Sequence, residues 1–64
     1  MVFINGKKEE IEHSNLLEYL KEKKYDTKRI AVELNENVIK KELYEFTYLS
    51  DGDRVEIVCF VGGG

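Results

Sequence analysis

Several residue types on which small secreted proteins, metal sites and membrane proteins depend are scarce in this sequence. It contains one cysteine, Cys59, and one histidine, His13. A single cysteine excludes an internal disulfide, and secreted domains of this size usually carry several, so we expect a reducing, cytoplasmic location. No apolar run approaches the length of a membrane span, and the N-terminus lacks the apolar region of a signal peptide. We therefore expect no membrane partner.

Charge of either sign is not concentrated anywhere along the chain. The 10 lysines and arginines are interspersed with 13 aspartates and glutamates, which gives a formal net charge of −3. Nucleic acid is not expected as the main partner, because binding phosphates requires a concentrated basic face. The 64 residues suffice for one small domain over residues 1–64. A domain of this size buries only about 60% of its unfolded surface, so a deep, enclosed active site is not expected either.

The sequence also lacks the patterns of an enzyme. It contains no glycine-rich phosphate loop between a strand and a helix, no cluster of metal ligands and no recognisable Ser/His/Asp set. His13 lies among acidic residues and is interpreted as a solvated turn residue, and Asp51 and Asp53 lack the remainder of a calcium loop. Cys59 lies in a predicted strand, where a lone cysteine is usually a small buried hydrophobe. We expect no bound metal or cofactor and no catalytic activity.

The first residues predict a β-hairpin. Val2-Phe3-Ile4 is a short β-prone run, and Asn5-Gly6 follows it directly. Asn-Gly is the strongest short hairpin signal, because both central residues of a type I′ turn need a positive φ. The return strand is expected over residues 7–11, and alternation places Phe3 on the face opposite its two neighbours.

A helix is predicted next. Asn15 is a suitable N-cap residue, and Glu18, three positions later, completes a pair of the capping-box type. The helix is expected to end near residues 25–27, although no glycine marks its end. The residues that recur at helical spacing are Leu16, Tyr19, Leu20 and the stem of Lys23.

The middle of the chain alternates between strand and turn signals. Residues 30–34 form a near-continuous apolar run, which predicts a central, well-buried strand. Residues 35–37 predict a turn, and a brief strand follows at Val38-Ile39. The pattern is weakest over residues 40–49. There we expect one short helical turn, anchored by Leu43, Tyr44 and Phe46, with Leu49 closing the core.

The final strand runs directly into three glycines. Residues 51–53 predict the turn before it. Gly62–Gly64 have no side chains to pack, so we expect a flexible tail that extends about 10 Å. Alternation along the strand directs Val55, Ile57 and Cys59 toward the core and directs Glu56, Val58 and Phe60 toward solvent.

The outward side chains beside the tail predict a partner-binding surface. Val58 and Phe60 are apolar residues on a solvent face, and an exposed apolar patch marks an interaction site. Phe3, on the outward face of the first strand, is expected to extend this surface. The alternatives are an inward-facing pair or a contact between copies of the chain.

Four motifs occur in a fixed order along the whole chain. They are the Asn5-Gly6 hairpin, the helix start over residues 15–20, the strand over residues 30–35, and the run from Asp51 to Val58 that leads to Phe60-Val61-Gly62-Gly63-Gly64. In this order they resemble the ThiS family, the sulfur carriers of thiamine biosynthesis. The elements alone predict an α+β fold with one main helix across a mixed sheet. The resemblance implies that this fold is the ubiquitin-like β-grasp, with four to five strands.

The resemblance also implies a function for the carboxylate of Gly64. An ATP-using, ubiquitin-activating-enzyme-like (ThiF-like) adenylyltransferase would adenylate it, and sulfur relayed from a cysteine desulfurase would displace AMP. The resulting thiocarboxylate would donate its sulfur to a thiazole synthase (ThiG-like). The residues agree with a requirement for adenylation. A terminal carboxylate is ionised at neutral pH and resists nucleophilic attack until it is activated. Glycines without Cβ suit a tail that enters a narrow active site.

Two other functions remain compatible with the sequence. The small subunit of molybdopterin synthase also uses a C-terminal thiocarboxylate, although that family is usually somewhat longer. A ubiquitin-like protein modifier or binding module would instead have its tail joined to lysines, or would carry an inert tail, and the glycines would then be a frayed end.

Overall fold

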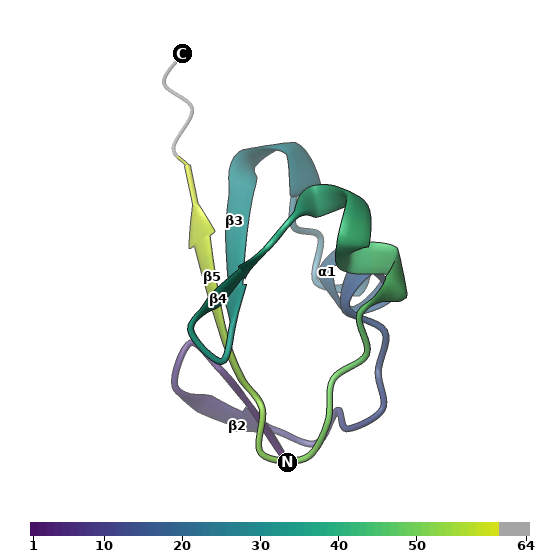
Figure 1. The fold of residues 1–64 in the computed structure, drawn as a ribbon, viewed down its shortest axis with the longest axis vertical. Helices are drawn as coiled ribbons and strands as arrows, with labels where there is room; N and C mark the ends of the chain where they lie inside the picture. The colour runs from purple at the N-terminus through teal and green to yellow at the C-terminus, as the bar shows by residue number, and fades with distance from the viewer. Residues whose placement is uncertain (61–64) are drawn as a thin grey trace.

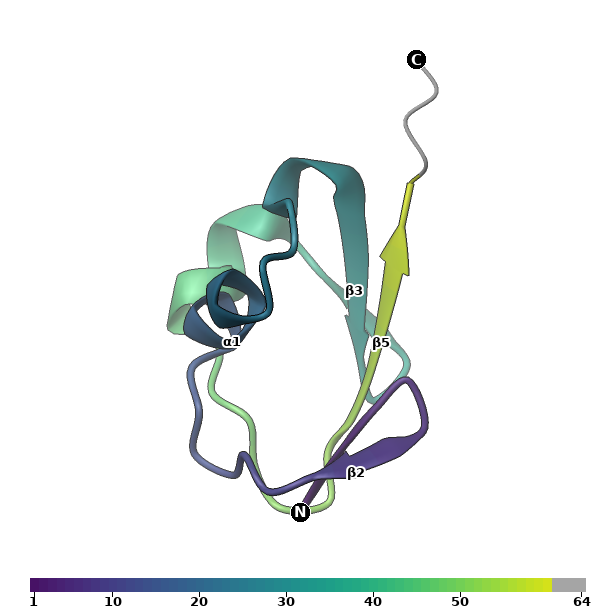
Figure 2. The same ribbon diagram turned by 180° about the vertical axis from the view of Figure 1, so that it is seen from behind.

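The structure, a computed structural model, describes residues 1–60 and contains a five-stranded mixed sheet. Its strand order is β2-β1-β5-β3-β4, and β1 and β5 are parallel whereas the other neighbours are antiparallel. A helix, α1, and two short 3₁₀ helices, η1 and η2, lie on one side of the sheet (Figures 1 and 2). The predicted α+β arrangement is therefore confirmed. The elements are β1 (Val2–Ile4), β2 (Lys7–Glu9), α1 (Leu16–Glu22), η1 (Thr27–Arg29), β3 (Ile30–Leu34), β4 (Asn37–Ile39), η2 (Lys41–Phe46) and β5 (Arg54–Cys59).

Helix α1 begins as the sequence predicts. The side-chain oxygen of Asn15 accepts a hydrogen bond from the backbone N–H of Glu18 at 3.1 Å. This bond satisfies one of the N–H groups that the first turn of a helix leaves without a partner. The first turn thus starts at the residue that the capping pattern indicates.

The end of α1 explains why no glycine is needed there. Lys24 takes the left-handed conformation, with a φ of 64°. Its N–H donates to the carbonyl of Lys21 at 3.0 Å, and the N–H of Tyr25 donates to the carbonyl of Leu20 at 2.9 Å. These two bonds form the Schellman motif, in which glycine usually occupies the left-handed position. Lys23 is exposed, and its ammonium lies over the ring of Tyr19, 5.9 Å from the ring centroid.

Two hairpin turns have positive φ values at their central residues. In the first turn φ is 50° at Asn5 and 84° at Gly6, as a type I′ turn requires. In the second, between β3 and β4, φ is 51° at Asn35 and 71° at Glu36. Both hairpins were predicted, but β2 ends at Glu9 and is shorter than the expected strand over residues 7–11.

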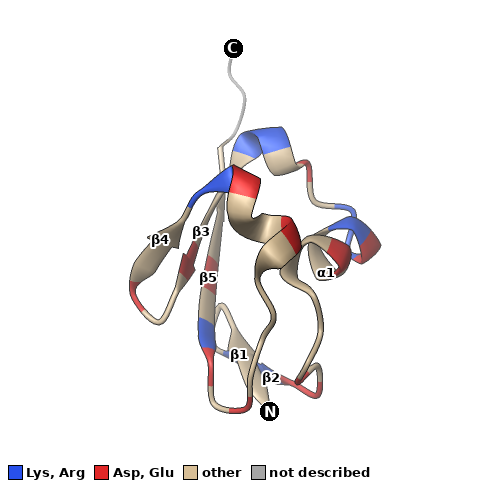
Figure 3. Ribbon diagram, turned by 45° about the vertical axis from the view of Figure 1, so that its right-hand side comes forward, with Lys and Arg blue, Asp and Glu red and all other residues tan. Residues whose placement is uncertain are grey.

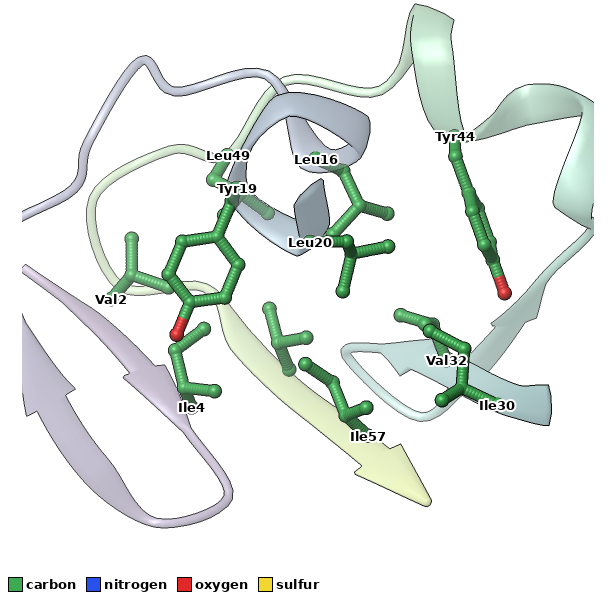
Figure 4. Packing of buried hydrophobic residues seen from close by; sticks show 11 residues of the cluster. Val2, Ile4, Leu16, Tyr19, Leu20, Ile30, Val32, Tyr44, Leu49 and Ile57 are labelled. Atoms are coloured by element: carbon green, nitrogen blue, oxygen red, sulfur yellow. The ribbon is translucent and has the colours of Figure 1, made fainter. Parts of the chain in front are cut away.

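The hydrophobic core lies between the sheet and the helical layer. Figure 4 shows side chains from the strands pointing toward those of α1, with Tyr44 reaching in from η2. Leu49 is 1% exposed and closes the core as predicted. Of the three residues expected to anchor η2 only Tyr44 is buried, because Leu43 and Phe46 lie on the side of this 3₁₀ helix that faces solvent. The core residues are Val2, Ile4, Leu16, Tyr19, Leu20, Ile30, Val32, Tyr44, Leu49, Val55 and Ile57.

Strand β3 is buried on one face only. It lies between β5 and β4, and its residues Ile30 and Val32 are buried whereas Glu33 is exposed. The helical layer covers one face of the sheet, so the side chains on the other face of β3 point away from the core. The prediction of a well-buried strand is therefore correct for one face and wrong for the other.

Candidate functional site

The first half of β5 is held on one edge by the side chain of Asn5. The backbone N–H of Asn5 donates to the carbonyl of Val55 at 2.8 Å. Its side-chain oxygen accepts from the N–H of Ile57 at 2.7 Å, and its side-chain amide donates to the carbonyl of Ile57 at 3.2 Å. The side chain of Asn5 thus continues the pairing between β1 and β5 after the backbone of β1 has turned away.

Asn35 holds the opposite edge of β5 in a similar way. Its backbone N–H donates to the carbonyl of Arg54 at 2.8 Å, and its side-chain oxygen accepts from the N–H of Arg54 at 3.0 Å. Its side-chain amide donates to a carboxylate oxygen of Asp53 at 3.0 Å. We call Asn5 and Asn35 the asparagine clamps. Sequence reasoning identified both only as turn residues; their common signal is an asparagine at the first position of each hairpin turn.

The end of β5 has a strand on one edge only. In the register with β3, Val58 lies opposite Ala31 and Cys59 lies opposite Ile30. The N–H of Phe60 then donates to the carbonyl of Arg29 at 2.7 Å. The hairpin of β1 and β2 lies near the other end of β5 (Figures 1 and 2). The last described residues before the tail are therefore fixed by β3 and η1 alone.

The outward side chains at this end are exposed and apolar, as predicted. Val58 is 55% exposed and Phe60 is 58% exposed. Phe3 also points outward, but it pairs with Arg54 at the start of β5. Since successive outward residues on a strand are about 6.6–6.8 Å apart, Phe3 lies about two such steps from Val58. The structure brings Val58 and Phe60 together and does not place Phe3 with them.

Two carboxylates separate Phe3 from the apolar pair. Glu33 and Glu56 lie directly opposite each other on the outer face, and Val38 lies opposite Glu33 on the next strand. Figure 3 shows the two acidic positions in the middle of β3 and β5. Like charges in directly opposite positions destabilise a sheet. The outer face therefore presents an acidic centre, with the apolar pair Val58 and Phe60 on the side toward the tail.

The predicted buried position of Cys59 is wrong. Cys59 is exposed, although it alternates in phase with the buried residues Val55 and Ile57. Cys59 forms the last pair in the register of β5 with β3, at the margin of the core, and the described part of the chain leaves its side chain exposed there. His13 is exposed in a turn, as interpreted from the sequence. Among residues 1–60 no group of three or more His, Cys, Asp or Glu side chains is placed to hold a metal ion.

Shifted pKa values belong to groups away from this end of β5. Burial, together with a hydrogen bond of 3.2 Å to the Glu9 carboxylate, raises the pKa of Tyr19 to about 12. Burial also raises the pKa of Tyr44. The Met1 ammonium is bonded to Asp51 and Glu12, which raises its own pKa and lowers the pKa of each carboxyl group. None of these groups belongs to the last residues of β5.

The tail itself, Gly62–Gly64, lies outside the described residues. The predicted role of Gly64 as the reacting group therefore stays a prediction. The partner-binding role of Val58, Phe60 and Phe3 also stays a prediction, although their positions are now known. In the part of the chain that the structure describes, no helix is long and apolar enough to cross a membrane.

The fold and the end of β5 together define a class of protein, the small ubiquitin-like β-grasp proteins. The crystal structure of a thiamine biosynthesis protein (ThiS) from Geobacter metallireducens matches with a TM-score of 0.77 and 36% identity, over 98% of this chain and 97% of that one. The model of the ThiS family matches residues 2–64. The chain belongs to the ThiS family.

Curated relatives agree with this assignment. The sulfur carrier protein ThiS of Bacillus subtilis is 38% identical over 66 aligned positions, which cover all of both chains. A thiazole synthase of Paramagnetospirillum magneticum is 39% identical over 62 positions, which are 95% of this chain but 19% of that protein. Two further relatives, both described as uncharacterized, are 43% identical over 49 residues, and the aligned region spans 65% of their length.

Proposed function

We propose that this protein is a sulfur carrier whose C-terminal Gly64 carboxylate is converted to a thiocarboxylate for thiazole formation. The observation that carries the proposal is the arrangement of β5. The strand is clamped on both edges at its start, and it leads into Gly62–Gly64 in a chain of the ThiS family. A fixed strand followed by side-chain-free residues allows another protein to reach the terminal group without unfolding the sheet.

The chemistry requires activation before sulfur transfer. The carboxylate of Gly64 attacks the α-phosphorus of ATP, which releases pyrophosphate and forms an acyl adenylate. The terminal sulfur of a donor persulfide then attacks the acyl carbon, and AMP leaves with the electron pair of the broken C–O bond. The acyl disulfide that forms is cleaved by a thiol reductant, which takes up the donor's sulfur in a new disulfide and releases the thiocarboxylate. ATP is consumed by the activating enzyme and is not a resident cofactor of the carrier. We therefore propose that the protein is a co-substrate and not an enzyme.

Three partners follow from this sequence of steps. A ubiquitin-activating-enzyme-like adenylyltransferase forms the adenylate, a cysteine desulfurase or another donor supplies sulfur, and a thiazole synthase receives it. The last partner is supported by the thiazole synthase relative, because a stretch similar to this chain makes up 19% of that protein. Two proteins that must meet repeatedly gain a high effective concentration when they are joined. The cytoplasmic location stays a prediction.

Intact-mass spectrometry tests the proposal. The carrier is incubated with the adenylyltransferase encoded in the same genome, ATP, cysteine desulfurase with cysteine, and a thiol reductant such as dithiothreitol. We expect a mass increase equal to the exchange of one oxygen for sulfur, and we expect no such increase when Gly64 is deleted. Conjugates of higher mass would indicate a protein modifier, and an unchanged mass would contradict the proposal. Transfer of sulfur to thiazole synthase, and not to the large subunit of molybdopterin synthase, separates the two sulfur-carrier functions.

A further inference from the structure

Hydrogen bonds alternate between the two edges of β5. In an antiparallel pair, only every second residue exchanges backbone bonds with the partner strand. The bonds of Phe60 to Arg29 and of Asn35 to Arg54 show that the even-numbered residues of β5 face β3. The N–H and C=O groups of Val55, Ile57 and Cys59 consequently point to the other edge, where β1 lies.

Cys59 is the residue on that edge whose backbone groups find no partner within residues 1–60. The carbonyl of Val55 accepts from the backbone of Asn5, and the side chain of Asn5 satisfies both backbone groups of Ile57. The chain turns away at Gly6, so neither β1 nor β2 reaches Cys59. Figures 1 and 2 show the upper part of β5 with β3 on one side and no strand on the other.

We propose that an extended segment of the adenylating enzyme pairs with this open edge at Cys59 and becomes an added strand of the sheet. This inference rests on the proposed function and gives the partner contact a definite geometry. An unpaired strand edge is a template for another extended chain, and main-chain bonds of this kind are a recurrent mode of recognition. The edge lies five residues before Gly64.

The surroundings of the edge define the segment that fits it. Val58 and Phe60 flank Cys59 on the outer face and are more than half exposed, so the added strand is expected to carry apolar side chains on that face. Asn5 occupies both backbone groups of Ile57 on this edge. The segment is therefore expected to pair with β5 after Ile57, starting at Cys59. A second copy of this chain fits less well. Over the described residues, two copies would pair only Cys59 with Cys59, which gives two hydrogen bonds.

Amide hydrogen exchange at single residues tests the pairing. The carrier, free or bound to the adenylyltransferase, is exposed to deuterated water, quenched in an aprotic solvent and measured by NMR. In the free carrier we expect rapid exchange at Cys59 and slow exchange at Val58, whose N–H faces β3. In the complex we expect Cys59 to become protected. Protection that rises with carrier concentration alone would show pairing between copies and would overturn the proposal.

Two variants at position 59 provide the second measurement. Cys59→Pro removes the N–H that points to the open edge, whereas Cys59→Ala keeps it and serves as the reference. Because this N–H has no bond within residues 1–60, both variants are expected to unfold at similar denaturant concentrations. Binding of the adenylyltransferase is expected to be about 2- to 10-fold weaker for the proline variant, the range given by one lost hydrogen bond. Phe60→Pro, which removes the bond to Arg29, is expected to destabilise the fold instead.

The outcomes separate this inference from the proposed function. If the carrier gains sulfur while Cys59 stays unprotected in the complex, the edge pairing is wrong and the sulfur-carrier function stands. Equal binding of the proline and alanine variants would also overturn the edge pairing. If the carrier neither binds the adenylyltransferase nor gains sulfur, both proposals fail.

Discussion

The two ends of β5 are built differently although they belong to one strand of six residues. At its start, the asparagine clamps and both neighbouring strands hold the backbone on two edges. At its end, β3 and the carbonyl of Arg29 hold one edge, and the outward side chains Val58 and Phe60 are exposed. The difference teaches that the strand is anchored on both edges as far as Ile57 and on one edge only beyond it.

The largest expected effect is the loss of sulfur transfer when the last residue of the chain is deleted. Deletion of Gly64 should abolish the gain of sulfur measured by intact-mass spectrometry, because the remaining Gly63 carboxylate is one residue too short for an active site built for the full tail. The urea midpoint of unfolding should not change, since no core side chain is removed. A lower midpoint in the deletion variant would show that the tail also contributes to folding.

The inner and outer faces of β5 should differ strongly in stability. Ile57→Ala is expected to lower the free energy of unfolding by about 2–4 kcal/mol, because this side chain is 6% exposed in the core. Val58→Ala, at a position that is 55% exposed, should cost below about 1 kcal/mol. Urea unfolding measures both. If the first variant does not fold, Ile57→Val should still cost about 0.5–1.5 kcal/mol; equal costs on the two faces would contradict the packing described.

The clamp at Asn5 should contribute to the anchored end. Asn5→Gly removes both side-chain hydrogen bonds to Ile57 and tolerates the φ of 50°, so the loss combines the two bonds with the larger backbone entropy of glycine in the unfolded chain. The expected decrease in the free energy of unfolding is about 1–2 kcal/mol. Asn5→Asp keeps the acceptor for the N–H of Ile57 and should cost less than the glycine variant. A glycine variant as stable as the wild type would show that water replaces the clamp without loss.

The apolar pair should matter for partner binding and not for folding. Phe60→Asp and Val58→Asp are each expected to slow adenylation by about 5- to 10-fold, the effect of losing an interface residue worth above 1 kcal/mol. Phe46→Asp is the matched control, because Phe46 is 71% exposed on η2, away from the outer face of the sheet. Pyrophosphate release measures the rate. If both variants of β5 unfolded, the assignment of faces would be reversed.

The smallest expected effect is a pH dependence of the free energy of unfolding that comes from Tyr19 in the core. The pKa of Tyr19 is raised from 10.0 to about 12, so its neutral phenol is favoured in the folded state. The stabilisation that follows is present in full below pH 10 and is lost as the pH rises through about 12. Tyr19→Phe should therefore show a smaller decrease in urea stability across this range. An equally steep decrease in the phenylalanine variant would assign the pH dependence to another group.

Local signals in the sequence predicted the elements, because their causes lie within a few residues of one another. The cap at Asn15, the turn at Asn5-Gly6 and the strand over residues 30–34 are examples. The end of α1 at a left-handed lysine carries no such signal, since nothing in residue type separates Lys24 from its neighbours. The β-grasp fold followed from the resemblance to a family and not from periodicity, and the order of the strands in the sheet was not predicted.

The candidate site was predicted less completely for two physical reasons. The clamp of Asn5 on Ile57 joins residues 52 positions apart, and no local pattern reports such a contact. The exposure of Cys59 depends on how far the core extends along β5, which alternation along a strand does not record. The distance of Phe3 from Val58 and Phe60 was not predicted for a related reason. Alternation predicts the face of the sheet on which a residue lies, but the register between strands decides its position along that face.

The parallel pairing of β1 with β5 gives the molecule a polarity that is useful in practice. Both strands start at the same end of the sheet, where the carbonyl of Met1 accepts from the N–H of Gly52 at 2.7 Å. Phe60 lies at the opposite end (Figures 1 and 2). A surface, a fluorophore or a preceding protein attached at Met1 is therefore separated from the exposed pair Val58 and Phe60 by the length of the sheet.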